Sequence, residues 1–262
     1  MAGINLELMR EKLEKMKAGY SSKSSQTDSD FFKPELNNSY QIRVLPPATG
    51  DDPFREVYFH YNVGARITCP RRNYGKNCPV CDFATLLWEE QKETGDVATA
   101  SLAKDLFAKP RYFTNLIVRG ENGDDSEPKS YTYSPKVQQD FLEIIADVDY
   151  GDITDPKKGY DITLSVSKSP KDRYSSTTLK PRKNPSPLSE KRTTAELLSL
   201  AKNLDELVEV LSEAEIREQM DRHFQEMETK LAVETTEETE AVPREQNPQE
   251  LFAELEQEIE SL

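Results

Sequence analysis

The feature of the sequence that most constrains the fold is the short stretch that contains all three cysteines. Cys69, Cys78 and Cys81 follow one another closely, and His60 precedes Cys69 by nine positions. Structural Zn²⁺ sites use four thiolates or imidazoles in a tetrahedron. A pair spaced like Cys78 and Cys81 can turn both sulfurs towards one ion, and the other histidine, His223, lies far along the chain. The pattern therefore predicts one structural Zn²⁺ held by His60, Cys69, Cys78 and Cys81.

Three alternatives remain for the cysteines. The "CPVC" sequence resembles a thioredoxin-like redox motif, although such a motif does not require a third cysteine and a nearby histidine. A zinc deaminase needs His-x-Glu and Pro-Cys-x-x-Cys, whereas here Asn62 follows His60 by two positions and Asn77 precedes Cys78. The cysteines could also be packing residues without a metal.

Four protein ligands leave no open position on the ion for water or substrate. The metal is therefore expected to be structural and to stabilise the loop that carries its ligands. The chain has only two histidines, and its sequence shows no nucleophile paired with a general base. We therefore expect that the protein is not an enzyme, and we assign no catalytic residue.

The residues between the first two cysteines combine cations with an aromatic ring. Three bases and one tyrosine occupy this loop, and the combination recurs at three later stretches. Single-stranded nucleic acid is bound by cations that follow the phosphates and by aromatic rings that stack on bases. The residues are Arg71, Arg72, Tyr74 and Lys76 in the loop; Lys109, Arg111, Tyr112 and Phe113; Tyr131, Tyr133 and Lys136; and Lys171, Arg173 and Tyr174.

The charge of the chain is concentrated in its last quarter. Residues 188–262 contain 21 acidic and 7 basic residues, and so carry the whole net charge of −14. The preceding part is neutral, so a polyanionic partner is not excluded there. The tail can either mimic DNA in a cationic groove or recruit partner proteins. Its candidate contacts for partners are Leu251, Phe252, Leu255, Ile259 and Leu262.

The pattern of apolar residues predicts a small β-rich body with helical insertions. Strands are expected at 39–47, 55–63, 111–120, 129–134 and 159–169, and an extended segment at 174–189. Helices are expected at 81–95, 97–110 and 135–148, with two more within 193–231 and Thr194 as a cap. The domain boundaries that follow are an arm (1–20), a linker (21–30), a core (31–231) with a zinc subdomain (about 58–110), a linker (232–249) and an acidic tail (250–262).

These motifs together resemble the single-stranded-DNA-binding (helix-destabilising) proteins of T-even-like bacteriophages. The resemblance is carried by "YQIRVLPP", by the histidine and three cysteines, by "NYGKNCPVCD", and by "RYFTNLIVRG", "YTYSPK" and "DRYSS". It covers most of the chain, and it implies an OB-fold core with a zinc subdomain, an N-terminal arm and an acidic tail.

The resemblance implies a protein that coats single-stranded DNA cooperatively and without sequence preference, in replication, recombination and repair. It assigns stacking to Tyr74, Tyr112, Phe113, Tyr131, Tyr133 and Tyr174. It assigns self-association to the arm, for which Ile4, Leu8, Arg10 and Lys12 are the candidate contacts. The absence of a signal peptide or membrane span in the sequence predicts an intracellular protein. The resemblance implies that its location is the cytoplasm of a bacterial host cell. The competing hypothesis is a zinc-stabilised adaptor that binds proteins and not DNA.

Overall fold

The computed structural model describes residues 31–120 and 127–240, and within the last helix it describes the side chains of residues 213–226 and 229. The predicted arm, the first linker and the acidic tail lie outside the described residues. So do the candidate contacts for self-association and for protein partners.

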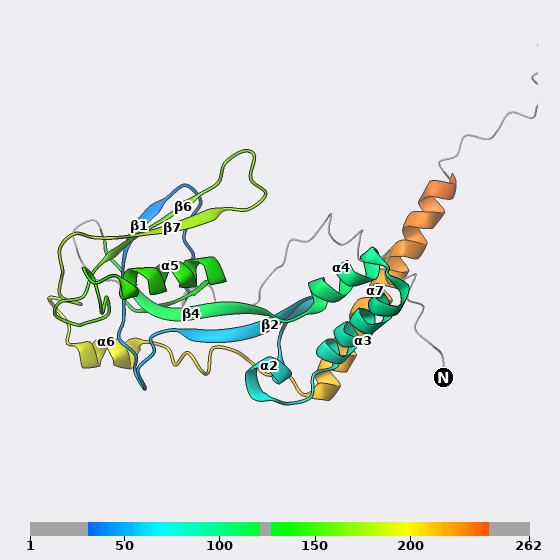
Figure 1. Ribbon diagram of the computed structural model, residues 1–262, viewed down its shortest axis with the longest axis horizontal. Coiled ribbons are helices and arrows are strands. Elements are labelled where there is room, and N and C mark those ends of the chain that lie inside the picture. The colour runs from blue at the N-terminus through cyan, green and yellow to red at the C-terminus, as the bar shows by residue number, and fades with distance from the viewer. Residues whose placement is uncertain (1–30, 121–126, 241–262) are drawn as a thin grey trace, which may run out of the picture.

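The described strands form one antiparallel sheet (Figure 1). The strands are β1 (Ser39–Val44), β2 (Arg55–Val63), β3 (Ala65–Thr68), β4 (Lys109–Val118), β5 (Lys129–Tyr133), β6 (Ile162–Ser167) and β7 (Ser176–Pro181). Their order is β3-β2-β4-β1-β6-β7, and β5 also pairs with β4. β2 and β4 are the longest strands and run from the main body of the sheet towards a group of helices at its far end.

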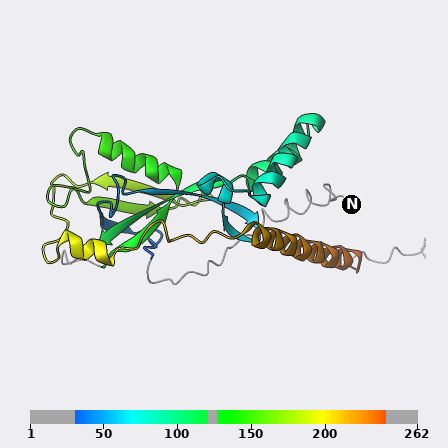
Figure 2. The same cartoon turned by 90° about the horizontal axis from the view of Figure 1, so that it is seen from below.

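The helices divide between the two ends of the molecule (Figures 1 and 2). They are α2 (Pro70–Tyr74), α3 (Pro79–Thr94), α4 (Val97–Leu106), α5 (Pro135–Ala146), α6 (Thr194–Leu200) and α7 (Glu213–Glu240). We use "Cys/His lobe" for β3, α2, α3, α4 and α7. Among the described residues, no helix combines the length and apolar character that crossing a membrane requires.

The two sides of the sheet are covered by different segments. On one side, Val137 and Phe141 of α5 pack on Val44 and Leu116. On the other side, Leu197 of α6 packs on Leu45 and Ile117. We call these the α5 side and the α6 side. The prediction of a mainly β fold with helical insertions is confirmed.

Several positions of the predicted secondary structure are wrong. The helix predicted at 97–110 ends at Leu106, since β4 begins at Lys109, and β3 and α2 were not predicted. The N-cap of α6 is Thr193, not Thr194, because the Thr193 hydroxyl accepts from the Glu196 amide in a capping box. Residues 201–212, which we expected to be mostly helical, contain neither helix nor strand. The predicted linker at 232–249 begins too early, since α7 continues to Glu240.

A buried ionic network ties the α6 side to the loops around it. Arg43 is fully buried, and its Nη2 donates to the carbonyl oxygens of Asp155 at 2.7 Å and Ser186 at 3.0 Å. Asp161 lies 3.7 Å from Arg43 and 3.0 Å from Arg119. Burial lowers the pKa of Arg43, and the attraction of Asp161 opposes that shift. The network fixes the segment that leads from β7 to α6.

Gly159 closes this network because no side chain fits there. A Cβ at this position would lie 2.5 Å from the Ile153 carbonyl oxygen and 2.6 Å from Arg43 Nη2. We therefore expect Gly159→Ala to lower the free energy of unfolding by about 1–3 kcal/mol, as overpacking does. Urea titration measures this change. The neighbouring exposed Lys157→Ala should stay within about 0.5 kcal/mol of the parent, and equal effects of the two changes would contradict the account.

Candidate functional site

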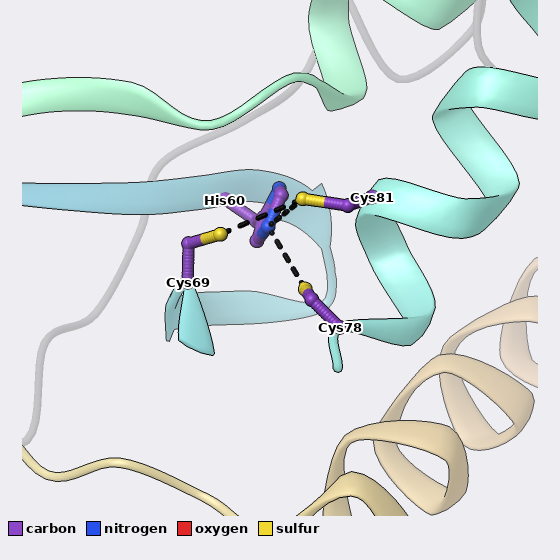
Figure 3. Close-up of side chains that lie close together, drawn as sticks. All are labelled: His60, Cys69, Cys78 and Cys81. Atoms are coloured by element: carbon purple, nitrogen blue, oxygen red, sulfur yellow. Dashed lines mark hydrogen bonds between the residues drawn. The ribbon is translucent and has the colours of Figure 1, made fainter. Parts of the chain in front are cut away.

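The predicted metal ligands converge in the Cys/His lobe (Figure 3). The donor atoms of His60, Cys69, Cys78 and Cys81 all lie within 4.8 Å of one another, and all four residues are buried. His60 Nε2 is 3.2 Å from Cys78 Sγ and 3.5 Å from Cys81 Sγ. Cys69 Sγ is 3.5 Å from Cys81 Sγ. The cluster could hold one metal ion.

Each ligand is positioned by the end of a local element. His60 lies in β2 and Cys69 directly follows β3. Cys69 is the N-cap of α2, and its sulfur accepts from the Arg72 amide at 3.3 Å. Cys78 is the N-cap of α3, and Cys81 lies in the first turn of that helix. The positive end of the α3 dipole favours the thiolate form of Cys78 and Cys81.

The His60 ring is oriented by a backbone carbonyl. Its Nδ1 lies 2.7 Å from the oxygen of Leu106. Since a carbonyl can only accept, Nδ1 carries the hydrogen and Nε2 presents its lone pair to the cysteines. This is the arrangement that a metal-bound imidazole requires.

The electrostatics of the three thiols fit a cation. Hydrogen bonds from Cys78 and Cys81 lower the pKa of the Cys69 thiol. Hydrogen bonds to Cys69 and Cys78, together with burial, raise the pKa of the Cys81 thiol. Three thiolates this close repel one another, so ionisation of one opposes ionisation of the next. A divalent cation offsets this repulsion, and three sulfurs with one imidazole are a donor set that Zn²⁺ prefers.

Asn73 connects the loop that begins at Cys69 to strand β2 through hydrogen bonds. Its Nδ2 donates to the Cys69 oxygen at 2.8 Å and to the Tyr58 oxygen at 2.9 Å. Its Oδ1 accepts from the Tyr58 amide at 3.0 Å. The sequence gives no signal for this role, because two of the three bonds reach Tyr58, which lies 15 positions away and is brought close only by the fold. The loop between Cys69 and Cys78 thus contains a short helix, α2, held against β2.

The bases of this loop face outwards. The Arg72 guanidinium lies 4.4 Å from the centre of the Tyr58 ring, and Lys76 lies 6.0 Å from that of Tyr74, which is 40% exposed. Arg71 forms an ion pair with Asp82 at 2.5 Å. The loop therefore presents cations and aromatic faces in pairs. Tyr58 was not predicted, although it lies two residues before His60, a candidate metal ligand.

The hairpin formed by β6 and β7 carries the most exposed predicted residues. Residues 167–176 are all exposed, Tyr174 is 73% exposed, and Arg173 lies 5.4 Å from the centre of its ring. Figure 1 shows the turn of this hairpin projecting from the sheet. Lys171 lies in the same turn.

The aromatic residues of β4 and β5 are mostly buried. Phe113, Tyr131 and Tyr133 are 2%, 4% and 3% exposed. Tyr131 and Tyr133 do share one face of their strand, as predicted, and their ring centres lie 5.1 Å apart. Burial raises the pKa of Tyr131 to about 12 and that of Tyr133 well above the usual value. These three rings are placed as core residues, so the stacking proposal below does not include them.

Tyr112 is the accessible end of the aromatic row. Its ring stacks on Tyr133 with centres 6.2 Å apart, and it is only partly buried. Its hydroxyl donates to Glu56 at 2.5 Å, which raises the pKa of Tyr112 to about 12. The phenol is thus neutral at any ordinary pH, and its ring is held in place.

The remaining predicted cations lie nearby but differ in their partners. Lys109 is 3.7 Å from Asp105, and Lys136 forms an ion pair with Asp140 that raises its pKa. Arg111 is partly buried in β4, next to Tyr112. Apart from the three buried rings and Lys136 in α5, the structure thus places the predicted residues in three regions that are at least partly exposed: the loop between Cys69 and Cys78, the start of β4 and the β6–β7 turn.

Two comparisons with known proteins bear on this site. The family model described as gp32 DNA binding protein like matches residues 37–227, which is well over half of the chain. No curated protein matches the chain. The matched range includes all four ligands of the cluster and all three exposed basic and aromatic positions.

Proposed function

The chain belongs to the gp32 DNA-binding-protein-like family, and from this premise we propose that it binds single-stranded DNA without sequence preference and has no catalytic role. The observation that carries the proposal is that a family member places cations beside accessible aromatic rings. Lys76 lies near Tyr74 and Arg173 near Tyr174, and Arg111 precedes the partly buried Tyr112 in β4. Every nucleic-acid base has a π face, so stacking on aromatic rings does not depend on the DNA sequence.

Two kinds of contact would hold the strand. Tyr74, Tyr112 and Tyr174 would stack on bases, each contributing about 1–3 kcal/mol. The cations beside them would follow the phosphates. A ring that contacts a cation in the free protein can stack on a base instead. The exposed cation–π contact that is lost contributes only about 0.5–1 kcal/mol, which is less than the stacking contributes. The displaced cation then gains a phosphate. The cations are Arg71, Arg72, Lys76, Lys109, Arg111, Lys136, Lys171 and Arg173.

We further propose that the ion in the Cys/His lobe is a single structural Zn²⁺. His60, Cys69, Cys78 and Cys81 would hold it, and it would supply only folding energy, because four protein ligands fill its coordination sphere. Its effect on DNA binding is indirect, through the position of α2.

The finer roles follow the same family premise. We propose cooperative coating of DNA through the arm, contacts with replication and recombination proteins through the acidic tail, and action in DNA repair within a phage-infected bacterial cytoplasm. These roles correspond to the domains predicted from sequence, namely the arm, the core and the tail. The start of the second linker is the exception, because α7 extends to Glu240.

Competition binding tests the proposal. Fluorescently labelled oligo-dT is titrated with the full chain, and unlabelled oligo-dT or duplex DNA of the same length is then added. We expect oligo-dT to compete at least tenfold better than duplex, because a duplex hides the base faces that the tyrosines require. Equal competition would contradict the proposal.

The adaptor hypothesis gives the opposite result. A protein that uses its basic loop and acidic tail only for protein partners would leave oligo-dT anisotropy unchanged at all concentrations. Loss of affinity in Tyr174→Ala, with no loss in the control Leu86→Ala at another exposed position, would assign the binding to the β6–β7 turn.

A further inference from the structure

The segment that joins α6 to α7 crosses the α6 side of the sheet. We call residues 201–212 the strap. Leu204, Leu207 and Val208 of the strap pack against the cluster formed by Val57, Phe59 and Phe113. In Figure 1 the strap is the yellow trace that runs beside β2 from α6 to α7. It therefore covers the part of the sheet that leads to the Cys/His lobe.

Both ends of the strap are anchored. Ala201 packs with α6 on the sheet, and Asn115 Nδ2 donates to the Lys202 oxygen at 2.8 Å. At the other end, Leu211 packs against the core of the Cys/His lobe. The last strap residues and the start of α7 also border a hollow of about 470 Å³ that is lined by Lys76. The strap thus ends beside a predicted DNA contact.

Three cations share the side of the sheet that the strap crosses. In the antiparallel register Arg55 pairs with Phe113, Arg111 with Val57, and Lys109 with Phe59. Paired residues of antiparallel strands point to the same side of a sheet. Arg55 is therefore in line with the proposed phosphate contacts Arg111 and Lys109, although the sequence analysis did not select it.

The strap presents acids next to this row. Asp205, Glu206 and Glu209 are exposed, while the apolar residues between them face the sheet. Asp205 Oδ1 lies 2.9 Å from Arg55 Nε, with 39% of the Arg55 side chain and 66% of the Asp205 side chain exposed. The Arg55 Nε forms no aligned hydrogen bond, even to this close carboxylate. The contact is thus held by charge alone. The Nε atom itself is buried, whereas the two side chains are partly exposed around it.

We propose that the strap is an internal competitor for the DNA backbone, in which the Asp205 carboxylate occupies Arg55 in the place that a phosphate would take. This inference rests on the proposed function. It concerns a segment packed on the sheet, distinct from the acidic tail at 250–262. A phosphate carries the same charge as the carboxylate and offers more acceptor oxygens, so it can take over Arg55 without displacing the apolar anchors of the strap.

A double-mutant cycle on the full chain tests the competition. Asp205→Asn, Arg55→Gln and the double variant are titrated with labelled oligo-dT across a series of salt concentrations. We expect Asp205→Asn to raise affinity about two- to fivefold, the range set by one exposed ion pair. One added phosphate contact should also steepen the salt slope by about 0.7. In the Arg55→Gln background the same substitution should change neither quantity.

Glu209→Gln is the matched control, because it removes the same charge from the same strap. We expect it to change affinity less than twofold. If Asp205→Asn raises affinity equally in the parent and in the Arg55→Gln variant, the gain comes from long-range electrostatics and the inference is overturned. A loss of affinity in Asp205→Asn would also overturn it. In either case the proposed function would stand. Failure of the unmutated chain to bind oligo-dT would instead remove the proposed function, and the inference with it.

Discussion

The Cys78→Ser variant is expected to lose the metal ion and to unfold the Cys/His lobe. Cys69, Cys78 and Cys81 belong to one buried cluster that includes Ile67, Leu87, Ile216 and Met220. Structural Zn²⁺ contributes about 10–16 kcal/mol to small domains that fold around it, which is comparable to the whole stability of a domain, about 5–15 kcal/mol. The packing between α3 and α7 should be lost with the ion, since Phe83 and Phe224 contact each other within this cluster.

Metal content and proteolysis measure this effect together. The unmutated chain should contain one Zn²⁺ and resist cleavage between residues 70 and 110, whereas Cys78→Ser and the chelator-treated chain should be cleaved there. Thr94→Ala at the exposed end of α3 serves as the control, and should retain the ion and the resistance. A Cys78→Ser protein without metal that is as resistant as the parent would contradict the structural role of the ion.

Removal of Arg72 in α2 and of Lys76 just after this helix is expected to weaken DNA binding strongly. Arg72 lies over the ring of Tyr58 and Lys76 lies near that of Tyr74, so a strand that stacks on Tyr74 would bring its phosphates close to these cations. Each phosphate contact contributes about 0.7 to the salt slope of single-strand binding. The double variant Arg72→Gln with Lys76→Gln should therefore flatten the slope by about 1.4 and lower affinity at least tenfold at low salt.

A variant with the same change of net charge separates contact from overall charge. Lys92→Gln with Lys158→Gln removes two exposed cations from α3 and from the loop after α5. We expect this pair to leave the slope unchanged. Equal flattening by the two double variants would mean that α2 makes no phosphate contacts.

The convergence of the four candidate metal ligands was predictable because their signal is local and chemically restrictive. Zn²⁺ requires particular donors, and only His60 could complete the three cysteines within a short stretch. The strands and helices of the core were predictable from their periodicity, and Pro79 and Pro135 mark the first turns of α3 and α5.

The rest depends on contacts between distant residues. Strand alternation indicates that Tyr131 and Tyr133 share a face, but not that α5 covers it. Phe113 is adjacent to Tyr112 and points the opposite way, into the cluster beneath the strap.

The strap itself has helical spacing in the sequence but forms turns and bends over the sheet. Leu204, Leu207 and Val208 gain more by packing on the sheet than by continuing a helix, which is a case of tertiary packing overriding propensity. The pairing of Arg55 with Asp205 follows from that path and has no sequence signal.

The most direct test of the central claim is the affinity of the full chain for a short oligo-dT, measured at several salt concentrations. Contacts from the three basic and aromatic positions predict a linear fall of log affinity with log salt, with a slope of about −2 or steeper. An affinity that does not change with salt, or no binding at low salt, would contradict the claim that this chain binds single-stranded DNA.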